Sequence, residues 1–139
     1  MKLAVTLALT ALTSPVAAAA QEDPVRRDGP VQQLRIYRLH EASRVAFHER
    51  FRTEATRIMA RYGFDIVAMW EARNEGRPEF VYVLRWPDEA TMRRSWEAFM
   101  ADAEWAEIKR RSAVEHGPMV ESIEDRTLHL TNYSPPLAN

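Results

Sequence analysis

The first residues in this sequence that could take part in chemistry lie on a segment with the pattern of a β-strand, in which successive side chains point to opposite sides. Within residues 32–39, Q-Q-L-R-I-Y-R-L, Arg35 and Tyr37 point to the same side. If that side lines a cavity, the guanidinium can pair with an anionic ligand and the phenol can donate a hydrogen bond to it. The other interpretation, which we favour, is that Arg35 pairs within the sheet with an acid such as Glu121 or Asp125.

Aromatic side chains on two later strands form a second candidate group. Trp70, Tyr82 and Trp86 share one parity along residues 64–71 and 80–86. They can build an aromatic wall, either around a cavity or against the core beneath the helices. The sequence leaves both options open.

The histidines do not have the spacing of a helical metal site, and no cysteine is present to complete one. They stand at His40, His48, His116 and His129. We favour a structural or surface role for each of them. His129 is the exception most suited to face a cavity, because alternate residues of the last strand point to one side of the sheet. The candidate cavity-lining or ligand-binding residues are therefore Arg35, Tyr37, Trp70, Tyr82 and His129. We expect no metal and no cofactor, and no catalytic residue is assigned.

Composition and motifs exclude several classes of function. The 139 residues carry a net charge of −1 and no cysteine, so neither thiol catalysis nor a basic surface for nucleic acid is expected. No nucleophile elbow, phosphate-binding loop or dinucleotide-binding glycine motif is present. Residues 80–86, F-V-Y-V-L-R-W, lack the glycines of an RNA-binding strand.

Hydrophobic periodicity predicts the order β-α-β-β-α-β, with the second helical region split in two. We expect strands at residues 32–39, 64–71, 80–86 and within 119–130, and helices at 43–62 and from 88 to about 115. Asp88 and Asp102 are typical N-cap residues, so each should begin a helix. This order is typical of the ferredoxin-like α+β fold, a four-stranded antiparallel sheet with its helices on one face.

Three finer features are expected within these elements. The outer stripe of the first helix, which includes Arg50, Glu54 and Arg57, should be solvated. Residues 72–78, A-R-N-E-G-R-P, should form a hairpin loop longer than two residues. The apolar parity of the last strand shifts along its length, which indicates either a bulge or a late start of the strand.

The two hairpin strands are apolar on both parities, although a sheet with one face in water should alternate with polar residues. If about five or six such side chains stayed exposed to water, the fold would lose about 10 kcal/mol of hydrophobic stabilisation, at about 2 kcal/mol each. No helix remains in the sequence to cover the second face. We therefore expect a homodimer that packs sheet against sheet over roughly 400 Å², with residues 133–137 clasping the partner.

The first 20 residues are expected to be a cleaved secretory signal. Lys2 gives a positive start, Leu3 to Leu12 an apolar run, and Ala18-Ala19-Ala20 a small-residue cleavage site. Residues 21–31 should form a flexible lead-in and residues 32–137 the folded domain. The mature protein is then expected to be periplasmic or secreted, with no membrane span.

Several short motifs, in this order and spacing, resemble the NIPSNAP family. They are Gln33 to Tyr37, Trp70, Trp86-Pro87-Asp88, Trp96, Phe99, Asp102-x-Glu104-Trp105, Gly117-Pro118 and Tyr133-Ser134-Pro135. Gln33 departs from the pattern, since the family usually has Glu there, and Glu41-Ala42 stands where it often has Pro-Gly. The resemblance implies a dimeric α+β barrel of ferredoxin-like subunits with a cavity between the sheets. It implies no reaction.

Three functional hypotheses follow. The first is an exported homodimer that acts as a small-molecule-binding or interaction module, its partner being a small hydrophobic or anionic ligand. The alternative is a cofactor-independent enzyme, similar to the monooxygenases or isomerases of the dimeric α+β-barrel group. The third is a scaffold that uses the outer helix faces. An Arg–Tyr pair or a histidine converging in a cavity is the feature that would favour the enzyme.

Overall fold

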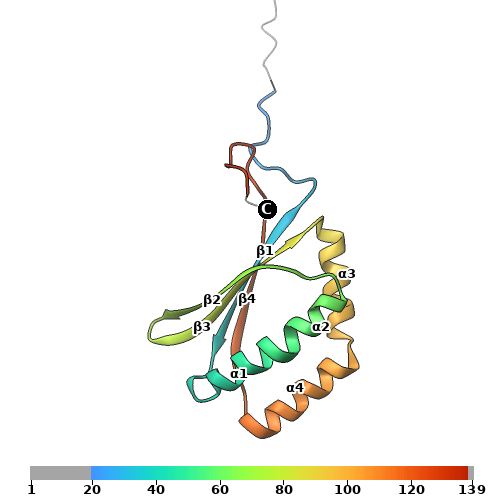
Figure 1. The fold of residues 1–139 in the computed structure, drawn as a ribbon. Helices are drawn as coiled ribbons and strands as arrows, with labels where there is room; N and C mark the ends of the chain where they lie inside the picture. The colour runs from blue at the N-terminus through green and yellow to red at the C-terminus, as the bar shows by residue number, and fades with distance from the viewer. Residues whose placement is uncertain (1–19, 138–139) are drawn as a thin grey trace, which may run out of the picture.

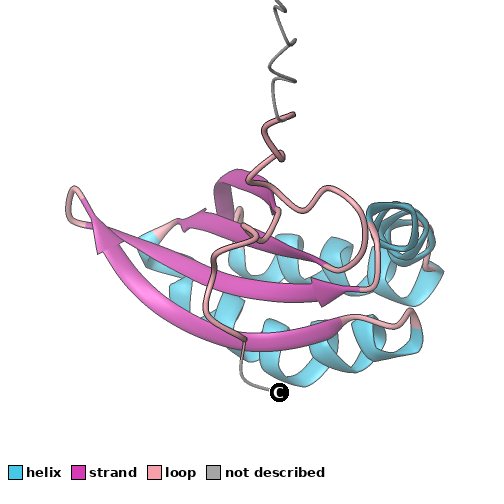
Figure 2. Cartoon of the chain, turned by 90° about the horizontal axis from the view of Figure 1, so that it is seen from above, coloured by secondary structure: helices cyan, strands magenta, loops and turns pink. Residues whose placement is uncertain are grey.

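The computed structural model describes residues 20–137, and the order of its elements is the predicted one. One antiparallel sheet has the strand order β2-β3-β1-β4, formed by β1 (Val31–Leu39), β2 (Asp65–Asn74), β3 (Arg77–Trp86) and β4 (Val120–Leu128). The helices lie on one side of this curved sheet (Figures 1 and 2). The predicted ferredoxin-like α+β architecture is confirmed. Except for Ala20, the predicted signal lies outside the described residues.

Two aspartates begin the helices that follow β3. Asp88 accepts a hydrogen bond of 2.6 Å from the amide of Thr91 at the start of α3 (Glu89–Met100). Asp102 accepts one of 2.8 Å from the amide of Trp105 at the start of α4 (Ala103–His116). Each carboxylate satisfies a first-turn amide that has no partner within the helix. Both predicted caps are confirmed.

The first helical segment is continuous but contains a wider turn. It comprises a 3₁₀ turn η1 (Glu41–Ser43), α1 (Arg44–Arg50), a π-helical turn η2 (Phe51–Ala55) and α2 (Thr56–Arg61). Phe47, Phe51 and Ala55, spaced by four, are all buried. In a regular α-helix, with about 3.6 residues per turn, residues spaced by four move gradually around the helix axis. The wider π-helical turn compensates for this rotation and keeps the three side chains on one face. The predicted helix over 43–62 is confirmed, with this irregularity at its centre.

The helix-facing side of the sheet forms the core. Alternate residues of β1 and β3 are buried there, among them Val31, Gln33, Leu39, Phe80, Tyr82, Leu84 and Trp86. Side chains of the first helical segment and of α3 and α4 pack against them, including Phe47, Ile58, Met59, Phe99 and Trp105. The core is thus rich in aromatic rings.

The other face of the sheet has an apolar centre with charged residues along its margins. In the register of the strands, Leu34 lies opposite Val83 and Ile36 opposite Val81, and the indole of Trp70, which is 51 % exposed, lies beside Val81. Charged side chains flank this centre at Glu79, Arg85, Glu124 and Arg126. Within residues 20–137 no helix covers this open face (Figure 2).

Two bulges decide which side chains share a face. In β2 the register shifts between Ile66 and Ala68, so Trp70 lies opposite Val81 and not opposite Tyr82. The expected wall of Trp70, Tyr82 and Trp86 is therefore wrong for Trp70, because one extra residue in the strand reverses the parity beyond it. In β4 the register shifts across from Leu39, which is the bulge, one of the two predicted options.

The hairpin between β2 and β3 is tighter than predicted. Asn74 pairs with Arg77, so its loop consists of Glu75 and Gly76 alone. Both loop residues have positive φ, 51° and 77°, as the common two-residue hairpin turn requires. The prediction of a longer loop is wrong because Glu stands where Asn or Asp usually precedes the glycine of such a turn.

The lead-in and the tail of the described chain pair with each other. Val25 bridges Thr131, the amide of Arg26 donates to Leu130 O at 2.9 Å, and the amide of Asn132 donates to Pro24 O at 2.9 Å. Part of the segment expected as a flexible lead-in is thereby joined to the segment after β4.

Among the helices of residues 20–137, none is long and apolar enough to cross a membrane.

Candidate functional site

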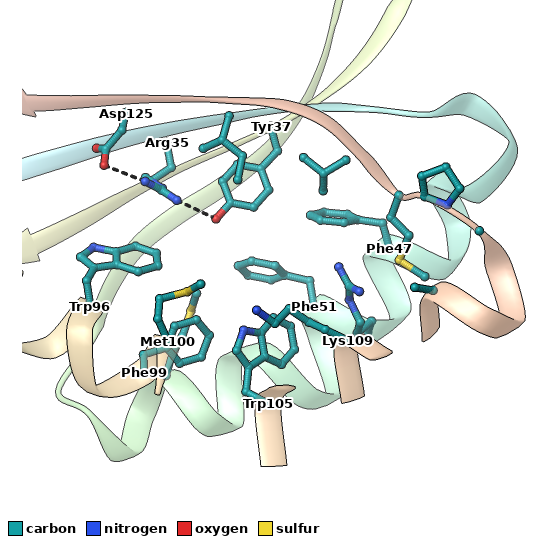
Figure 3. A pocket seen from close by; sticks show the side chains of 18 residues that line it. Arg35, Tyr37, Phe47, Phe51, Trp96, Phe99, Met100, Trp105, Lys109 and Asp125 are labelled. Carbon is teal, nitrogen blue, oxygen red and sulfur yellow. Dashed lines mark hydrogen bonds and ion pairs between the residues drawn. The ribbon is translucent and has the colours of Figure 1, made fainter. Parts of the chain in front are cut away.

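A cavity of about 580 Å³ lies between the helix-facing side of β1 and β4 and the helices below them (Figure 3). Buried side chains form its deep wall, namely Phe47, Phe51, Met59, Phe99 and Trp105. Exposed residues of the α3–α4 region and β4 surround its mouth, among them Met100, Pro118 and Ile123. The charged and hydroxyl groups that reach it come from Arg35, Tyr37, Arg50, Lys109 and Asp125.

Arg35 extends from β1 into the cavity, and three neighbours hold its guanidinium. Nη1 donates to the carboxylate of Asp125 at 2.6 Å, and Nη2 donates to the hydroxyl of Tyr37 at 3.1 Å. The guanidinium also lies 4.4 Å from the centroid of the Trp96 ring, a cation–π contact. The favoured prediction of a pair within the sheet is confirmed for Asp125, whereas Glu121 pairs with Arg77.

The hydroxyl groups of Tyr37 and Tyr82 lie 3.0 Å apart behind Arg35. Tyr82 is fully buried, and the hydroxyl of Tyr37 is the one acceptor among the described residues within hydrogen-bond distance of its own hydroxyl. Either oxygen can be the donor in this contact; we assign Tyr82 as the donor, since its proton would otherwise be buried without an acceptor. The oxygen of Tyr37 then accepts from both Arg35 and Tyr82, which leaves its own proton free to donate into the cavity. Burial raises the pKa of Tyr82 well above its ordinary value, so Tyr82 keeps its proton.

A buried glutamine fixes the other side of the Arg35–Asp125 pair. Gln33 is 2 % exposed, and its Oε1 accepts from the indoles of Trp86 at 3.1 Å and Trp96 at 2.7 Å. Its Nε2 donates to both carboxylate oxygens of Asp125, at 2.9 and 3.0 Å. A Glu at this position has no such donor, so the amide is what allows Asp125 to lie against residue 33. Gln33 thus orients the ring that covers Arg35 and the acid that pairs with it.

A second cationic group lies around Trp105. The guanidinium of Arg50, from the end of α1, is 5.4 Å from the centroid of the Trp105 ring, and Lys109 Nζ is 5.8 Å from it. Lys109 and Trp105 are one turn apart on α4 and lie together in Figure 3. Arg50 Nη1 donates to Ser112 Oγ at 2.8 Å, and burial lowers the pKa of Arg50.

The expectation that Arg50 lies on a solvated stripe is wrong. Its side chain turns toward the cavity from the residue directly before the π-helical turn, next to the buried Phe51. Sequence reasoning also missed Lys109. The available signal was its spacing of four from Trp105, since two residues spaced by four share a helix face.

The five predicted site residues lie in three places. Arg35 and Tyr37 line the cavity, and Tyr82 lies directly behind Tyr37. Trp70 is on the open face of the sheet. His129 directly follows β4, and its Nε2 is 3.1 Å from the carboxylate of Glu89 at the start of α3. Ligand binding by any of the five stays a prediction.

The other histidines show no metal-site geometry. His48 Nε2 lies 2.7 Å from Glu71, which also accepts from Arg44. His116 lies beside Glu115 at the end of α4. Within residues 20–137 no three histidine or acidic side chains converge as metal ligands do.

Comparison with known proteins links this fold to a family. The NIPSNAP family model matches residues 32–135, and a search of curated proteins found no match. An uncharacterized NIPSNAP-like domain protein from Burkholderia xenovorans is similar with a TM-score of 0.65 at 20 % identity, over 78 % of this chain and 91 % of that chain. A NIPSNAP family protein of unknown function from Agrobacterium tumefaciens has a TM-score of 0.64 at 17 % identity, over 76 % and 92 %.

At these identities the solved structures show a shared fold and nothing about function. The family match covers most of the chain, from the start of β1 to the tail after β4, and includes every strand of the sheet. It confirms the resemblance found in the sequence. The chain belongs to the NIPSNAP family.

Proposed function

We propose that this chain is a small-molecule-binding module whose ligand occupies the cavity between β1, β4 and the helices. The observation that carries the proposal is the cavity itself, about 580 Å³ in volume, buried and apolar at depth and open beside β4. Small-ligand sites usually have this size, with apolar walls and a few convergent polar groups. The descriptions of the similar structures assign no function, so the proposal rests on this geometry.

The cavity offers a ligand an apolar body site and several donors, of which the hydroxyl of Tyr37 lies at the Arg35 end. Phe51, Phe99 and Trp105 present carbon surface from three helical segments, and each buried CH₂ of a ligand contributes about 0.8 kcal/mol. The free proton of Tyr37 can donate to a ligand oxygen, because its own oxygen already accepts from Arg35 and Tyr82. A ligand with an apolar body and at least one acceptor oxygen fits these groups.

This cavity differs from the one expected from the sequence. That one lay between the sheets of two subunits, whereas the cavity described above lies between the sheet and the helices of one chain. Ligand binding here therefore does not require a second subunit.

We propose further that two chains pair through their open sheet faces. Leu34, Ile36, Val81 and Val83 form an apolar centre there, and the side chain of Trp70 is 51 % exposed. An apolar centre inside a polar margin is the usual composition of a protein interface. Two exposed tail residues, Tyr133 and Leu137, would add area if the tail crosses to the partner. The mouth of the cavity lies on the helix side, so dimer formation would leave it open.

We retain the proposal that the chain is exported after cleavage behind Ala20. It rests on the order of Lys2, the apolar run to Leu12 and the alanines before Gln21. Intact mass measurement of the protein from a periplasmic or secreted fraction tests it. A chain that begins at Gln21 supports export, and a chain that retains residues 1–20 contradicts it.

The enzyme alternative has one specific observation in its favour. An Arg–Tyr pair does converge in the cavity, with Nη2 of Arg35 3.1 Å from the hydroxyl of Tyr37. A phenol whose proton is directed into an apolar cavity can act as a general acid toward a bound carbonyl, as an isomerase requires. Turnover that is abolished in Tyr37→Phe, while ligand affinity changes little, would support this alternative over simple binding.

Native mass spectrometry of the purified mature protein tests the proposed function. We expect an assembly of two subunits, with extra mass of a small molecule retained on each. Gentle unfolding should release that molecule, because it is held by packing in the cavity and not covalently. If the protein neither retains nor takes up any apolar molecule when a panel is added, the binding function is refuted. A monomer that does bind refutes the dimer alone.

A further inference from the structure

Within residues 20–137, two cations in the cavity form no ion pair with an acid, whereas most of the arginines there do. Arg44, Arg61 and Arg77, all at the surface, lie 2.6–2.7 Å from carboxylates. Arg50 is half-buried, yet among the described residues it forms no ion pair. It donates to the neutral Ser112 and lies over the rings of Phe47 and Trp105, and Glu49 and Glu54 line a neighbouring pocket without pairing with it. Lys109 likewise contacts the Trp105 ring and no described carboxylate. A cation removed from water without a counter-ion is costly.

The other cation in the cavity, Arg35, is already neutralised. Asp125 accepts from its Nη1, and Tyr37 accepts from its Nη2. An anionic ligand beside Arg35 would be repelled by the carboxylate of Asp125. The cavity therefore has a compensated polar end at Arg35 and an uncompensated positive end at Arg50 and Lys109.

We infer that the ligand of this cavity is an apolar carboxylate whose headgroup binds between Arg50 and Lys109. The inference rests on the proposed binding function and adds the charge and the orientation of the ligand. The body of such a molecule lies along Phe51, Phe99 and Met100, and its carboxylate replaces the missing counter-ion beside Trp105. The mostly carbon lining around the two cations favours an amphipathic acid, with a fatty or aromatic body, over a fully polar anion.

Calorimetric binding of a matched pair of probes tests the inference. Decanoate and 1-decanol have the same chain length, and at pH 7.5 the first is an anion and the second is neutral. Each is titrated into the intact protein below its limit of aggregation. A hydrogen bond to a charged group contributes about 1.5–3 kcal/mol, so decanoate should bind about 10-fold or more tightly than decanol.

Variants locate the headgroup. Arg50→Gln should weaken decanoate about 10-fold and leave decanol unchanged, and Lys109→Gln, on a partly exposed side chain, should act in the same direction even if the first variant fails to fold. Arg57→Gln is the matched control, because Arg57 carries the same charge on the following helix but pairs with Glu54 and Glu104 outside the cavity. It should change neither affinity.

The outcomes separate the inference from the function on which it rests. If decanol binds as tightly as decanoate, or if both variants weaken the two probes equally, the anion site is refuted and the binding function stands. If neither probe binds, the binding function is contradicted as well. A preference for decanoate that disappears in the Lys109 and Arg50 variants alone supports the inference.

Discussion

Replacing Gln33 with methionine should destabilise the fold through two orphaned indole groups. Oε1 of Gln33 accepts from both Trp86 and Trp96, and methionine has similar length but offers no comparable acceptor. Trp86 is fully buried, so its N–H loses its partner without access to water, which costs about 1–3 kcal/mol. Trp96 borders the cavity and can regain a water there. Together we expect a loss of about 2–4 kcal/mol in the free energy of unfolding.

Urea denaturation followed by tryptophan fluorescence measures this loss. With an m-value of about 1–2 kcal/mol/M for a domain of this size, the midpoint should fall by about 1–4 M at unchanged m. Gln32→Met is the control, since Gln32 is the neighbouring glutamine on the open face of the sheet and should lose less than about 0.5 kcal/mol. A Gln33→Met loss below about 1 kcal/mol would refute the reasoning that the amide is essential to this network.

Gln33→Glu separates the two roles of Gln33, as acceptor for the two indoles and as donor to Asp125. It keeps the acceptor for the two indoles but places a carboxylate where Nε2 now lies, 2.9–3.0 Å from the oxygens of Asp125. Repulsion raises the folded-state pKa of the new carboxyl above its unfolded value. The variant should therefore approach wild-type stability as the pH falls toward about 4 and lose it as the pH rises. A deficit that does not depend on pH would contradict this assignment of the contacts.

Three further predictions concern other ionisable groups. Asp125→Asn should cost about 1–3 kcal/mol in urea denaturation, because it removes the counter-ion of Arg35, whose side chain is 12 % exposed; a loss below about 0.5 kcal/mol would contradict that. In an alkaline ultraviolet titration Tyr82 should ionise only as the protein unfolds, because burial raises its pKa, and ionisation near pH 10 in the folded state would show the hydroxyl to be accessible. The hydrogen bond from Tyr62, 2.6 Å long, lowers the pKa of Asp102. The stabilisation from Asp102 is therefore complete above the pKa of the unfolded state and is lost as the pH falls through the pKa of the folded state. Asp102→Asn should then reduce the fall in the free energy of unfolding at acid pH. An unchanged fall at acid pH would refute this prediction.

Local sequence signals were enough to predict the fold. Asp88 and Asp102 are residues that satisfy first-turn amides wherever a helix begins, so the two helices after β3 could be placed from the sequence alone. Period-two and helical patterns gave the order of elements, and that order limits the topology to very few arrangements. The helix-facing core followed from the same periodicity.

The arrangement of the site depends on features that have weak local signals. One extra residue in β2, near Val67, moves Trp70 to the open face, and no composition cue marks it. The π-helical turn accompanies the inward position of Arg50, although arginine on a polar stripe normally points to water. The pairing of Arg35 with Asp125 was foreseen as one of two acids, but choosing between Asp125 and Glu121 required the register of β4. Non-local register and helix irregularities therefore account for what sequence reasoning missed.

Titration of the four indole N–H signals with decanoate tests the central claim most directly. The tryptophans at 70, 86, 96 and 105 give resolved reporters in a protein labelled with ¹⁵N-tryptophan. Trp96 and Trp105 line the cavity, and Trp70 lies on the opposite face of the sheet. A ligand in the cavity should shift the signals of Trp96 and Trp105 and leave that of Trp70 in place. A shift of Trp70 alone, or no shift of any indole at saturating decanoate, would contradict a binding site between the sheet and the helices.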